Sequence, residues 1–308
     1  MRKTALDVVY ELANKNKNVI FIGSDLSPGV LKELKKEMPE KFLMEGISEQ
    51  HIIGMAAGMA MDGFVPYVNT ISTFITRRCY EQIVIDVCLH NLPVRLIGNG
   101  GGLVYAPLGP THQSIEDLSI MRSIPNMTVI APADDLEMRA LMSQSYNYRG
   151  PIYIRVAKGN EPRIYPKNQK FKIGKAINFK IGKDILLITT GITLHLAKEV
   201  DEHFKNTNIN IGIMHFNTVK PFDKKTLFKE LKKYKIVLTI EEHSILGGLG
   251  GICSELLLES NYHNKLKFKR IGLRDIFTEG YGSQKELMNK YNISLKYIVK
   301  QILKLKKK

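Results

Sequence analysis

The residue whose chemistry stands out in this chain is Glu49, a single carboxylate at the start of an apolar segment. Every residue from 52 to 61 is Gly, Ala, Ile or Met, so we expect a buried helix without a polar face. Gly54 and Gly58 share one side of that helix, where another backbone can approach closely. Burial raises the pKa of a carboxyl group, so Glu49 could exchange a proton near neutral pH. On local physics alone a helix cap is favoured over a catalytic role, because a negative charge suits the positive end of the helix dipole.

A second candidate for chemistry is His112, in the segment Thr111-His112-Gln113. It follows the rigid turn Leu108-Gly109-Pro110, on the carboxyl side of a strand expected near residues 94–97. Loops in this position bind ligands in open α/β sheets. A lone histidine more often makes a structural hydrogen bond, so both interpretations stay open for His112.

The segment 72–80 contains a third group of candidates. Helical spacing places Phe74, Arg77 and Tyr80 on one face. Taken alone, this pattern is typical of an apolar core stripe with a surface arginine.

Two glycine-rich segments invite a nucleotide-binding interpretation. Residues 247–251 precede a predicted helix but lack the G-x-G-x-x-G spacing, so tight packing of the loop against the helix is favoured. Residues 98–102 follow a predicted strand, which lets the backbone approach a ligand there. The second segment is no P-loop, because no Gly-Lys-Ser/Thr follows it.

The elements that must position these residues alternate between strand and helix patterns. This alternation predicts parallel sheets covered by helices, that is, an α/β fold. The turn-rich stretch 159–168 is typical of a linker, so we expect two domains, residues 1–165 and residues 172–308. The expected strands are 18–22, 65–68, 94–97, 127–130, 184–190, 209–213 and 235–239, and the expected helices are 30–37, 76–88, 113–121, 135–146, 194–203 and 224–233.

Length and composition fit two folded domains. The chain has 308 residues, of which 44% are hydrophobic and 24% charged. No segment predicts a membrane helix or a signal peptide. The three cysteines, Cys79, Cys88 and Cys253, lack metal-ligand spacing and indicate a reduced cytoplasm.

The net charge of +15 raises nucleic acid as a possible partner. The lysines are scattered, however, and no basic stripe with interleaved aromatic residues accompanies them. A solvated lysine-rich surface is therefore favoured, and we expect neither a nucleic acid nor a membrane as partner. An acidic partner subunit or a phosphorylated substrate could still use the positive field.

Taken together, the segments resemble the C-terminal two-thirds of a transketolase, an enzyme that depends on thiamine diphosphate. The resemblance extends in order over nearly the whole chain and both expected domains. It implies a pyrimidine-binding domain followed by a transketolase C-terminal domain. The residues that carry it are Gly23-Ser24-Asp25-Leu26, Gly46-Ile47-Ser48-Glu49-Gln50, Ser72-Thr73-Phe74, Gly109-Pro110-Thr111-His112-Gln113, Ile124-Pro125-Asn126-Met127-Thr128-Val129, Val219-Lys220-Pro221-Phe222-Asp223 and Glu241-Glu242-His243-Ser244-Ile245-Leu246-Gly247-Gly248-Leu249-Gly250.

One part of the family pattern is missing. Transketolases carry Gly-Asp-Gly, followed some tens of residues later by Asn, to hold the divalent metal and the diphosphate, and this sequence has no such motif. The resemblance therefore implies a split enzyme in which a separate N-terminal subunit holds the diphosphate with Mg²⁺ or Ca²⁺. We expect an α₂β₂ heterotetramer that shares thiamine diphosphate between subunits, no metal site in this chain, and a chain that is inert alone.

The resemblance gives each candidate residue a role. Glu49 would hydrogen-bond N1′ of the aminopyrimidine and favour its imino tautomer, which makes a catalytic role more probable than a helix cap. Phe74 matches the residue that stacks on the pyrimidine, and His112 matches a histidine that faces the reacting carbons. The expected cofactor-binding residues are Asp25, Ile47, Glu49, Phe74, Arg77 and Tyr80, and the expected catalytic residues are Glu49 and His112.

The donor pocket departs from the family pattern. Leu108 stands where transketolases carry an aspartate that binds a donor hydroxyl, and Gly100 stands where they carry a histidine. Losing a hydroxyl's partner changes selectivity strongly, so we expect a specialised sugar or aldehyde substrate. Arg2 and Lys158 fall where phosphate-binding arginines are expected. The expected substrate-binding residues are Arg2, Gly100, Leu108, His112 and Lys158.

Three other functions remain open. The first is the β subunit of a 2-oxoacid dehydrogenase, which shares this architecture. The second is a condensation of pyruvate with an aldehyde, as in deoxyxylulose-phosphate synthase, towards which Arg77 leans. The third is a non-catalytic regulatory subunit, against which the intact Glu49, Phe74 and His112 argue.

Overall fold

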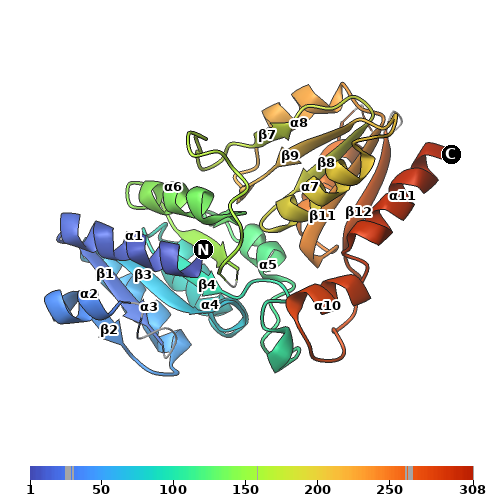
Figure 1. Cartoon of the computed structure of the whole chain (residues 1–308). Helices are drawn as coiled ribbons and strands as arrows, with labels where there is room; N and C mark the ends of the chain where they lie inside the picture. The colour runs from blue at the N-terminus through green and yellow to red at the C-terminus, as the bar shows by residue number, and fades with distance from the viewer. Residues whose placement is uncertain (25–28, 30, 158, 261, 263–265, 308) are drawn as a thin grey trace. The chain divides into compact units, whose positions relative to one another are not determined.

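The computed structural model describes residues 1–24, 29, 31–157, 159–260, 262 and 266–307. The chain divides into two compact units. The first unit consists of Met1–Gly101 and Ile120–Ile173, and the second of Gly102–Ser119 and Gly174–Lys308. Each unit contains a largely parallel sheet with helices against it (Figure 1), which confirms the predicted fold class.

The strands of the first unit are buried apolar runs, as parallel sheets covered on both faces require. They are β1 (Val19–Gly23), β2 (Phe42–Met44), β3 (Val65–Ile71), β4 (Arg95–Asn99), β5 (Thr128–Ile130) and β6 (Ile152–Val156). Their order is β5-β6-β4-β3-β1-β2, and all neighbouring pairs run parallel. The carboxyl ends of these strands therefore meet at one edge of the sheet, where candidate ligand sites are expected.

Helices of the first unit follow the apolar periodicity of the sequence. α1 buries Leu6, Val9 and Ala13 at helical spacing and packs against α6, whose N-cap Asp134 accepts a hydrogen bond from Glu137 N at 2.9 Å. The α-helices are α1 (Arg2–Lys15), α2 (Lys32–Glu37), α3 (Glu49–Met61), α4 (Tyr80–Gln82) and α6 (Asp135–Ser145), with a 3₁₀ helix η1 (Pro39–Lys41) and π-helices η2 (Phe74–Arg78) and η3 (Ile83–Cys88).

The second unit has a five-stranded sheet in the order β12-β11-β8-β9-β7. Its strands are parallel except that β7 runs antiparallel to β9. The elements are η4 (Ala106–Leu108), β7 (Ile177–Lys180), β8 (Ile185–Thr189), α7 (Thr193–Phe204), β9 (Ile211–His215), β10 (Thr218–Lys220), α8 (Lys224–Leu231), β11 (Ile236–Ser244), α9 (Leu249–Leu258), β12 (Lys267–Leu273), α10 (Gln284–Lys290) and α11 (Leu295–Lys307), while α5 (Asp117–Ser123) begins in this unit and ends in the first.

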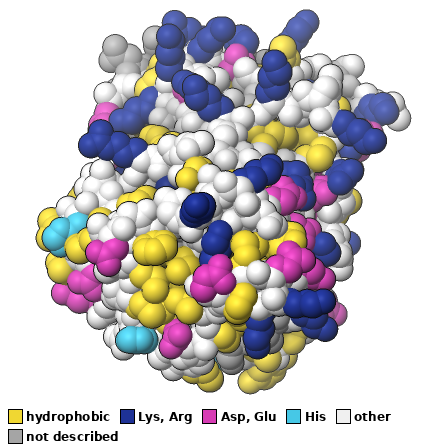
Figure 2. All heavy atoms as spheres, turned by 90° about the vertical axis from the view of Figure 1, so that its left-hand side faces the viewer, with side chains coloured by type: hydrophobic (Ala, Val, Ile, Leu, Met, Phe, Trp, Pro, Cys, Tyr) yellow, Lys and Arg dark blue, Asp and Glu magenta, His cyan; other side chains and the backbone are white. Residues whose placement is uncertain are grey.

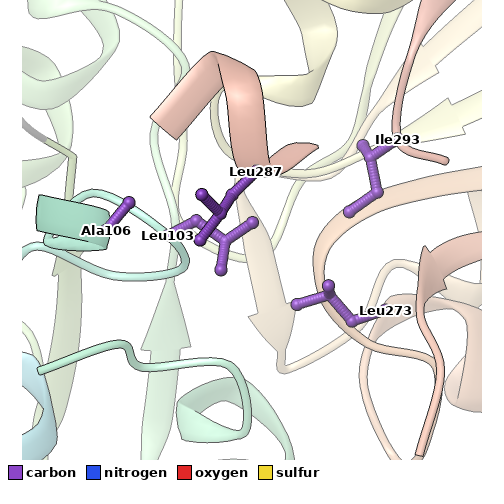
Figure 3. Packing of buried hydrophobic residues seen from close by; sticks show 5 residues of the cluster. All are labelled: Leu103, Ala106, Leu273, Leu287 and Ile293. Carbon is purple, nitrogen blue, oxygen red and sulfur yellow. The ribbon is translucent and has the colours of Figure 1, made fainter. Parts of the chain in front are cut away.

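Residues 102–119 belong to the second unit because their side chains share its core. A buried hydrophobic cluster joins this segment to residues that lie far along the chain (Figure 3): Leu103, Ala106, Leu273, Leu287 and Ile293. The helix expected at residues 113–121 begins only at Asp117. The residues before Asp117 thus stay in a loop, and this loop carries His112.

The prediction that the apolar helix α3 is buried on all sides is wrong. Ile52, Ile53 and Ala56 are buried, and α3 packs against β3 and η3. Gly58 is exposed, and a Cβ atom built there would meet no described atom within 4 Å. The apolar residues surround the helix, but the first unit covers only one side of it. Hydrophobic side chains also gather in patches among charged groups on the surface seen in Figure 2.

Candidate active site

Glu49 is held at the edge of the sheet where the parallel strands end. It is the first residue of α3 and only 2% exposed. The turn before it is fixed to β1, because Glu45 N donates to Gly23 O at 3.0 Å. Within that turn Gly46 has a φ of +65°, which favours glycine, and Ser48 Oγ donates to Glu45 O at 2.7 Å. The backbone therefore points a buried carboxylate at this edge.

The Glu49 carboxylate is paired with Arg78, a residue that sequence reasoning missed. Arg78 Nη1 donates to Glu49 Oε2 at 2.5 Å. The Arg78 guanidinium carbon lies 4.3 Å from the centre of the Phe74 ring, which is a cation–π contact. Arg78 thus links the carboxylate to the aromatic face. The only signal in the sequence is the tandem Arg77-Arg78 after Phe74.

The π-helix η2 explains why Arg78 and not Arg77 lies over Phe74. The expected stripe assumed α-helical spacing, whereas the wider π turn shifts which side chains share a face. Arg77 is exposed, and its predicted position on one face with Phe74 and Tyr80 needs this correction. π-helical turns are frequently found at functional sites. The neighbouring Cys79 is buried, and this burial raises the pKa of its thiol to about 12.

The contacts of Arg78 show what this site can bind. A guanidinium is a flat, nitrogen-rich group, and here it lies over an aromatic ring while it donates an N–H to a buried carboxylate. An aminopyrimidine ring needs the same two partners, a π face and a carboxyl oxygen. Glu49 and Phe74 therefore fit the pyrimidine ring of thiamine diphosphate.

Buried polar residues line the same edge of the sheet, and sequence reasoning did not find them. Asn99 Nδ2, at the end of β4, donates to Asn69 Oδ1 at 2.7 Å and to Thr70 O at 3.1 Å. Ser72 Oγ lies 2.6 Å from Tyr153 Oη. Such a buried network is costly unless its hydrogen bonds are made, so it fixes the strand ends rigidly. Its signal in the sequence is a polar residue at or just after the end of a strand, Asn99 in β4 and Ser72 after β3.

The other predicted residues of the first unit lie in varied surroundings. Tyr80 is half-buried, with its hydroxyl 3.2 Å from Ser123 Oγ, whereas Ile47 is 72% exposed. Gly100 is buried with a φ of +76°, and its N–H donates to Val156 O at 2.8 Å. Arg2 is half-buried at the start of α1. The predicted residues Asp25 and Lys158 lie outside the described residues.

His112 and Leu108 belong to the second unit. His112 is half-buried, its Nδ1 lies 2.9 Å from Thr111 Oγ1, and its ring meets the edge of Tyr105 at 6.5 Å between centres. Leu108 is 51% exposed. The loop therefore presents an imidazole and an apolar side chain to its surroundings. The residues at its two ends hydrogen-bond to β11.

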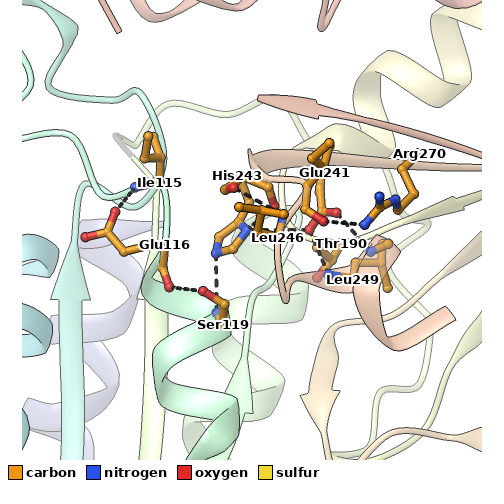
Figure 4. A network of polar contacts seen from close by, with 12 residues as sticks. Ile115, Glu116, Ser119, Thr190, Glu241, His243, Leu246, Leu249 and Arg270 are labelled. Carbon is orange, nitrogen blue, oxygen red and sulfur yellow. Dashed lines mark hydrogen bonds and ion pairs between the residues drawn. The ribbon is translucent and has the colours of Figure 1, made fainter. Parts of the chain in front are cut away.

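A network of polar contacts connects residues 115–119, which follow this loop, with β11 and the start of α9 (Figure 4). His243 Nε2 accepts from Ser119 N at 3.3 Å, while His243 Nδ1 lies 2.7 Å from Ser244 O. Glu241 accepts from Leu249 N at 2.7 Å and Gly250 N at 2.9 Å, at the start of α9.

The glycines at the start of α9 fit the packing interpretation of residues 247–251. A Cβ at Gly248 would lie 2.1 Å from Glu241 Oε2, and a Cβ at Gly250 would lie 2.8 Å from Thr239 Oγ1. Only glycine lets the polar network approach the helix so closely.

In the described part of the chain, no group of three or more His, Cys, Asp and Glu side chains could hold a metal ion. None of the described helices is both long and apolar enough to span a membrane.

Comparison with known proteins divides the chain at one point, between residues 163 and 174. Residues 1–163 match the family model "transketolase, pyrimidine binding domain", and residues 174–298 match "transketolase, C-terminal domain". The chain is 33% identical to the 6-deoxy-6-sulfo-D-fructose transketolase subunit of Clostridium sp. (strain MSTE9), over 97% of this chain and 92% of that protein. It is 34% identical to the 1-deoxy-D-xylulose-5-phosphate synthase of Halothermothrix orenii, over 96% of this chain but 46% of that protein. A solved split-gene transketolase, described as an inactive beta4 tetramer, superposes with a TM-score of 0.89 and 30% identity, over 98% of this chain and 97% of that one.

Proposed function

This chain belongs to the transketolase family, and we propose that it is the C-terminal subunit of a split transketolase. The proposed reaction transfers a two-carbon ketol unit from a ketose donor to an aldehyde acceptor. The observation that carries this proposal is the pairing of buried Glu49 with the Phe74 face through one flat cation, 2.5 Å from the carboxylate and 4.3 Å from the ring centre. The match to the Clostridium transketolase subunit also supports a split enzyme, because it covers 97% of this chain and 92% of that subunit.

The proposed cofactor is thiamine diphosphate, which when bound supplies a carbon nucleophile able to carry the two-carbon unit. Phe74 would stack on the pyrimidine ring, and Glu49 Oε2 would share a proton with a ring nitrogen. The ring would take over both contacts that Arg78 makes in this structure. The low exposure of Glu49, 2%, keeps water away from this proton.

The remaining assignments are proposed from the family resemblance. His112 would serve as a proton shuttle at the reacting carbons, and Arg2 and Lys158 would recognise an anionic part of the substrate. The cofactor site would comprise Asp25, Ile47, Glu49, Phe74, Arg77 and Tyr80, to which we add Arg78, and the substrate site would comprise Arg2, Gly100, Leu108, His112 and Lys158.

A separate N-terminal subunit would hold the diphosphate and a divalent ion, Mg²⁺ or Ca²⁺, in an α₂β₂ assembly. The open side of α3 supports a contact with another polypeptide, because a Cβ at Gly58 meets no described atom within 4 Å, and one at Gly54 meets only Asp86 Oδ2 at 4.0 Å. Small residues on such a face let a second helix approach closely. The apolar patches seen in Figure 2 are consistent with such a partner.

A specialised sugar is the proposed substrate. The exposed Leu108 offers no hydrogen bond where transketolases place a carboxylate for a donor hydroxyl. A similar subunit is named for 6-deoxy-6-sulfo-D-fructose, a ketose with an altered end. We therefore expect weak turnover of unmodified sugar phosphates.

Reconstitution tests the proposal. The chain is co-purified with the product of an adjacent gene that carries Gly-Asp-Gly and Asn, and ketol transfer to aldehydes is followed by mass spectrometry. We expect transfer by the complex with thiamine diphosphate and a divalent ion, and none by either chain alone. A complex that assembles and binds the cofactor but transfers no ketol unit from any ketose would contradict the proposal.

Condensation of pyruvate with an aldehyde is the second candidate, favoured by the 34% identity to a 1-deoxy-D-xylulose-5-phosphate synthase. Release of CO₂ with formation of a deoxyketose from pyruvate would establish it. Pyruvate-dependent reduction of an artificial electron acceptor would instead indicate the β subunit of a 2-oxoacid dehydrogenase. An assembled complex that is indifferent to loss of Glu49 would indicate a regulatory subunit.

A further inference from the structure

The loop that carries His112 is built as part of the second unit. It is closed on itself, because Gly102 N donates to Ser114 O at 2.7 Å and Ser114 N donates to Gly102 O at 2.9 Å. It is also joined to the end of β11, since Ser244 N donates to Ile115 O at 2.7 Å. The orientation of His112 therefore depends on residues more than a hundred positions away.

Glu242 makes the central contact with this loop. Its carboxylate is 3% exposed, and Oε1 accepts from Leu103 N at 2.7 Å and from Gln284 Nε2 at 2.8 Å. One buried oxygen thus joins the base of the loop to α10. A buried carboxylate with two donors is rigid, because losing either donor leaves a charge that water cannot reach.

The backbone of the loop is shaped for this carboxylate. Gly102 has a φ of +74°, and a Cβ there would lie 2.5 Å from Glu242 Cδ. Any other residue would push the carboxylate away from Leu103 N. The contact thus requires glycine at this position, both for the left-handed backbone and for the space that Glu242 occupies.

The loop is braced on both sides of His112 as well. Before it, Gly109 has a φ of +77°, and a Cβ there would lie 3.1 Å from the Tyr281 ring. After it, the buried side chain of Gln113 accepts a hydrogen bond from Thr278 Oγ1. His112 therefore projects from a turn whose two ends both rest on the segment between β12 and α10.

We propose that Glu242 is a positioning residue for His112, an inference that rests on the proposed function. It does not touch the reacting atoms. It fixes the backbone from which the imidazole projects, so that the second unit contributes to the reaction by holding this loop. A shift of about 1 Å in a reacting group can lower a rate roughly 10²-fold. Loss of the contact between Glu242 and Leu103 N should therefore lower kcat measurably.

A double-mutant cycle tests this proposal in the reconstituted complex. The variants are Glu242→Ala, His112→Ala and the double variant, with Glu242→Gln as the conservative replacement. We expect Glu242→Ala to lower kcat about 10- to 100-fold when His112 is present and less than about twofold when His112 is absent. Glutamine can still accept from Leu103 N, so Glu242→Gln should recover most of the loss. Affinity for thiamine diphosphate, measured by fluorescence titration, should stay within about twofold in all variants.

Glu230→Ala is the matched control, because Glu230, on α8 of the same unit, is a glutamate with 4% exposure that pairs with Lys233 just after the helix. It should leave kcat unchanged. Equal losses from Glu242→Ala with and without His112 would overturn the proposal, as would no loss at all. If Glu242→Ala does not fold, Gln284→Ala replaces it in the same cycle, and additivity there also overturns the proposal.

Failure of the proposed function is recognised separately. If the complex lacks ketol transfer, or if His112→Ala is fully active, the assignment of His112 fails. Hydrogen exchange then tests separately whether Glu242 holds the loop in place. Amides of residues 103–113 should then exchange at least about tenfold faster in Glu242→Ala than in Glu230→Ala. Unchanged exchange would show that Glu242 does not hold the loop.

Discussion

Glu49 and His112 are held in two different ways. Glu49 starts a regular helix, and its partner Arg78 lies 29 residues along the chain within the same unit. His112 projects from a loop whose base is bound by Glu242, which is 139 residues from its partner Leu103. One group is placed by the ends of parallel strands, and the other by buried side chains from a distant segment.

The difference teaches that a functional side chain can be placed by the regular elements next to it, as Glu49 is, or by contacts with residues far along the chain, as His112 is. The strand ends around Glu49 form whenever the sheet of the first unit forms, because the hydrogen-bond ladder sets their register. The His112 loop, in contrast, keeps its position only while its base is hydrogen-bonded to β11, and β11 in turn to α10. Substitutions in the first region should therefore affect chemistry directly, whereas substitutions in the second should act through loop position.

The largest expected effect comes from Glu49→Gln in the reconstituted complex. Glutamine keeps the shape but cannot share a proton in the same way, so kcat should fall about 10²- to 10⁴-fold. The exposed neighbour Glu45 offers the matched control, and Glu45→Gln should keep kcat within about twofold. Steady-state rates would decide the matter, and full activity of Glu49→Gln would remove Glu49 from the chemistry.

Gly102→Ala should produce the largest loss of stability. The positive φ costs about 1–2 kcal/mol, and the clash with Glu242 costs roughly another 1–3 kcal/mol, so the free energy of unfolding should fall by about 2–5 kcal/mol. Gly63 has a φ of +91° but no described atom within 4 Å of a Cβ, so Gly63→Ala reports the strain alone. Urea denaturation of both variants measures the difference. Equal losses would show that Glu242 moves aside freely.

Arg78→Ala should destabilise the first unit by an intermediate amount. It leaves the buried Glu49 carboxylate without its cation, and hydrogen bonds to charged groups contribute about 1–3 kcal/mol. Arg149, an exposed arginine of the first unit, is the matched control, and Arg149→Ala should change stability by less than about 0.5 kcal/mol. Chemical denaturation without cofactor compares the two variants. Equal losses from the two variants would show that the pairing of Arg78 with Glu49 does not stabilise the first unit.

Two substitutions at Gly58 can distinguish an effect on folding from an effect on assembly with the partner chain. Gly58→Ala should stabilise the chain by about 0.5–1 kcal/mol, because alanine favours the helix and the site has space for a Cβ. Gly58→Leu should also fold, but it should prevent close approach of another helix and weaken assembly. Lys198→Leu, at an exposed position of α7, is the control for added hydrophobicity. Analytical ultracentrifugation with the partner chain would show normal assembly of Gly58→Leu if this face is not an interface.

The smallest effect is expected at the Asp135–Arg163 pair on the surface of the first unit. The hydrogen bonds from Arg163 hold the pKa of Asp135 below its usual value, and Arg163 Nη2 lies 2.7 Å from Asp135 Oδ2. The stabilising contribution is therefore present above about pH 3.9 and is lost as the pH falls through the lowered pKa. Exposed pairs contribute up to about 1 kcal/mol, so Asp135→Asn should cost no more at pH 7. Thermal unfolding at pH 7 and pH 3 measures this, and an equal cost at both values would exclude an ionic origin.

Some of this architecture follows from the sequence directly. Apolar runs alternating with helical periodicity predict the parallel sheets, because burial on both faces requires such runs. The position of Glu49 before an apolar helix marks a candidate carboxylate, whereas the ring site with Phe74 follows only from the resemblance to transketolases. The glycines at 247–251 predict close packing because their spacing does not match a nucleotide loop.

The sequence by itself determined the alternation of strands and helices that gives the α/β fold, and it marked Glu49 as a candidate carboxylate at the start of an apolar helix. Tertiary structure alone decided that η2 is a π-helix, that Arg78 meets Glu49, and that residues 102–119 join the second unit. Periodicity reports which residues are apolar, but it does not report which surface covers them. For the same reason α3, apolar on every side, was expected to be buried, although only one side of it has a sheet to contact.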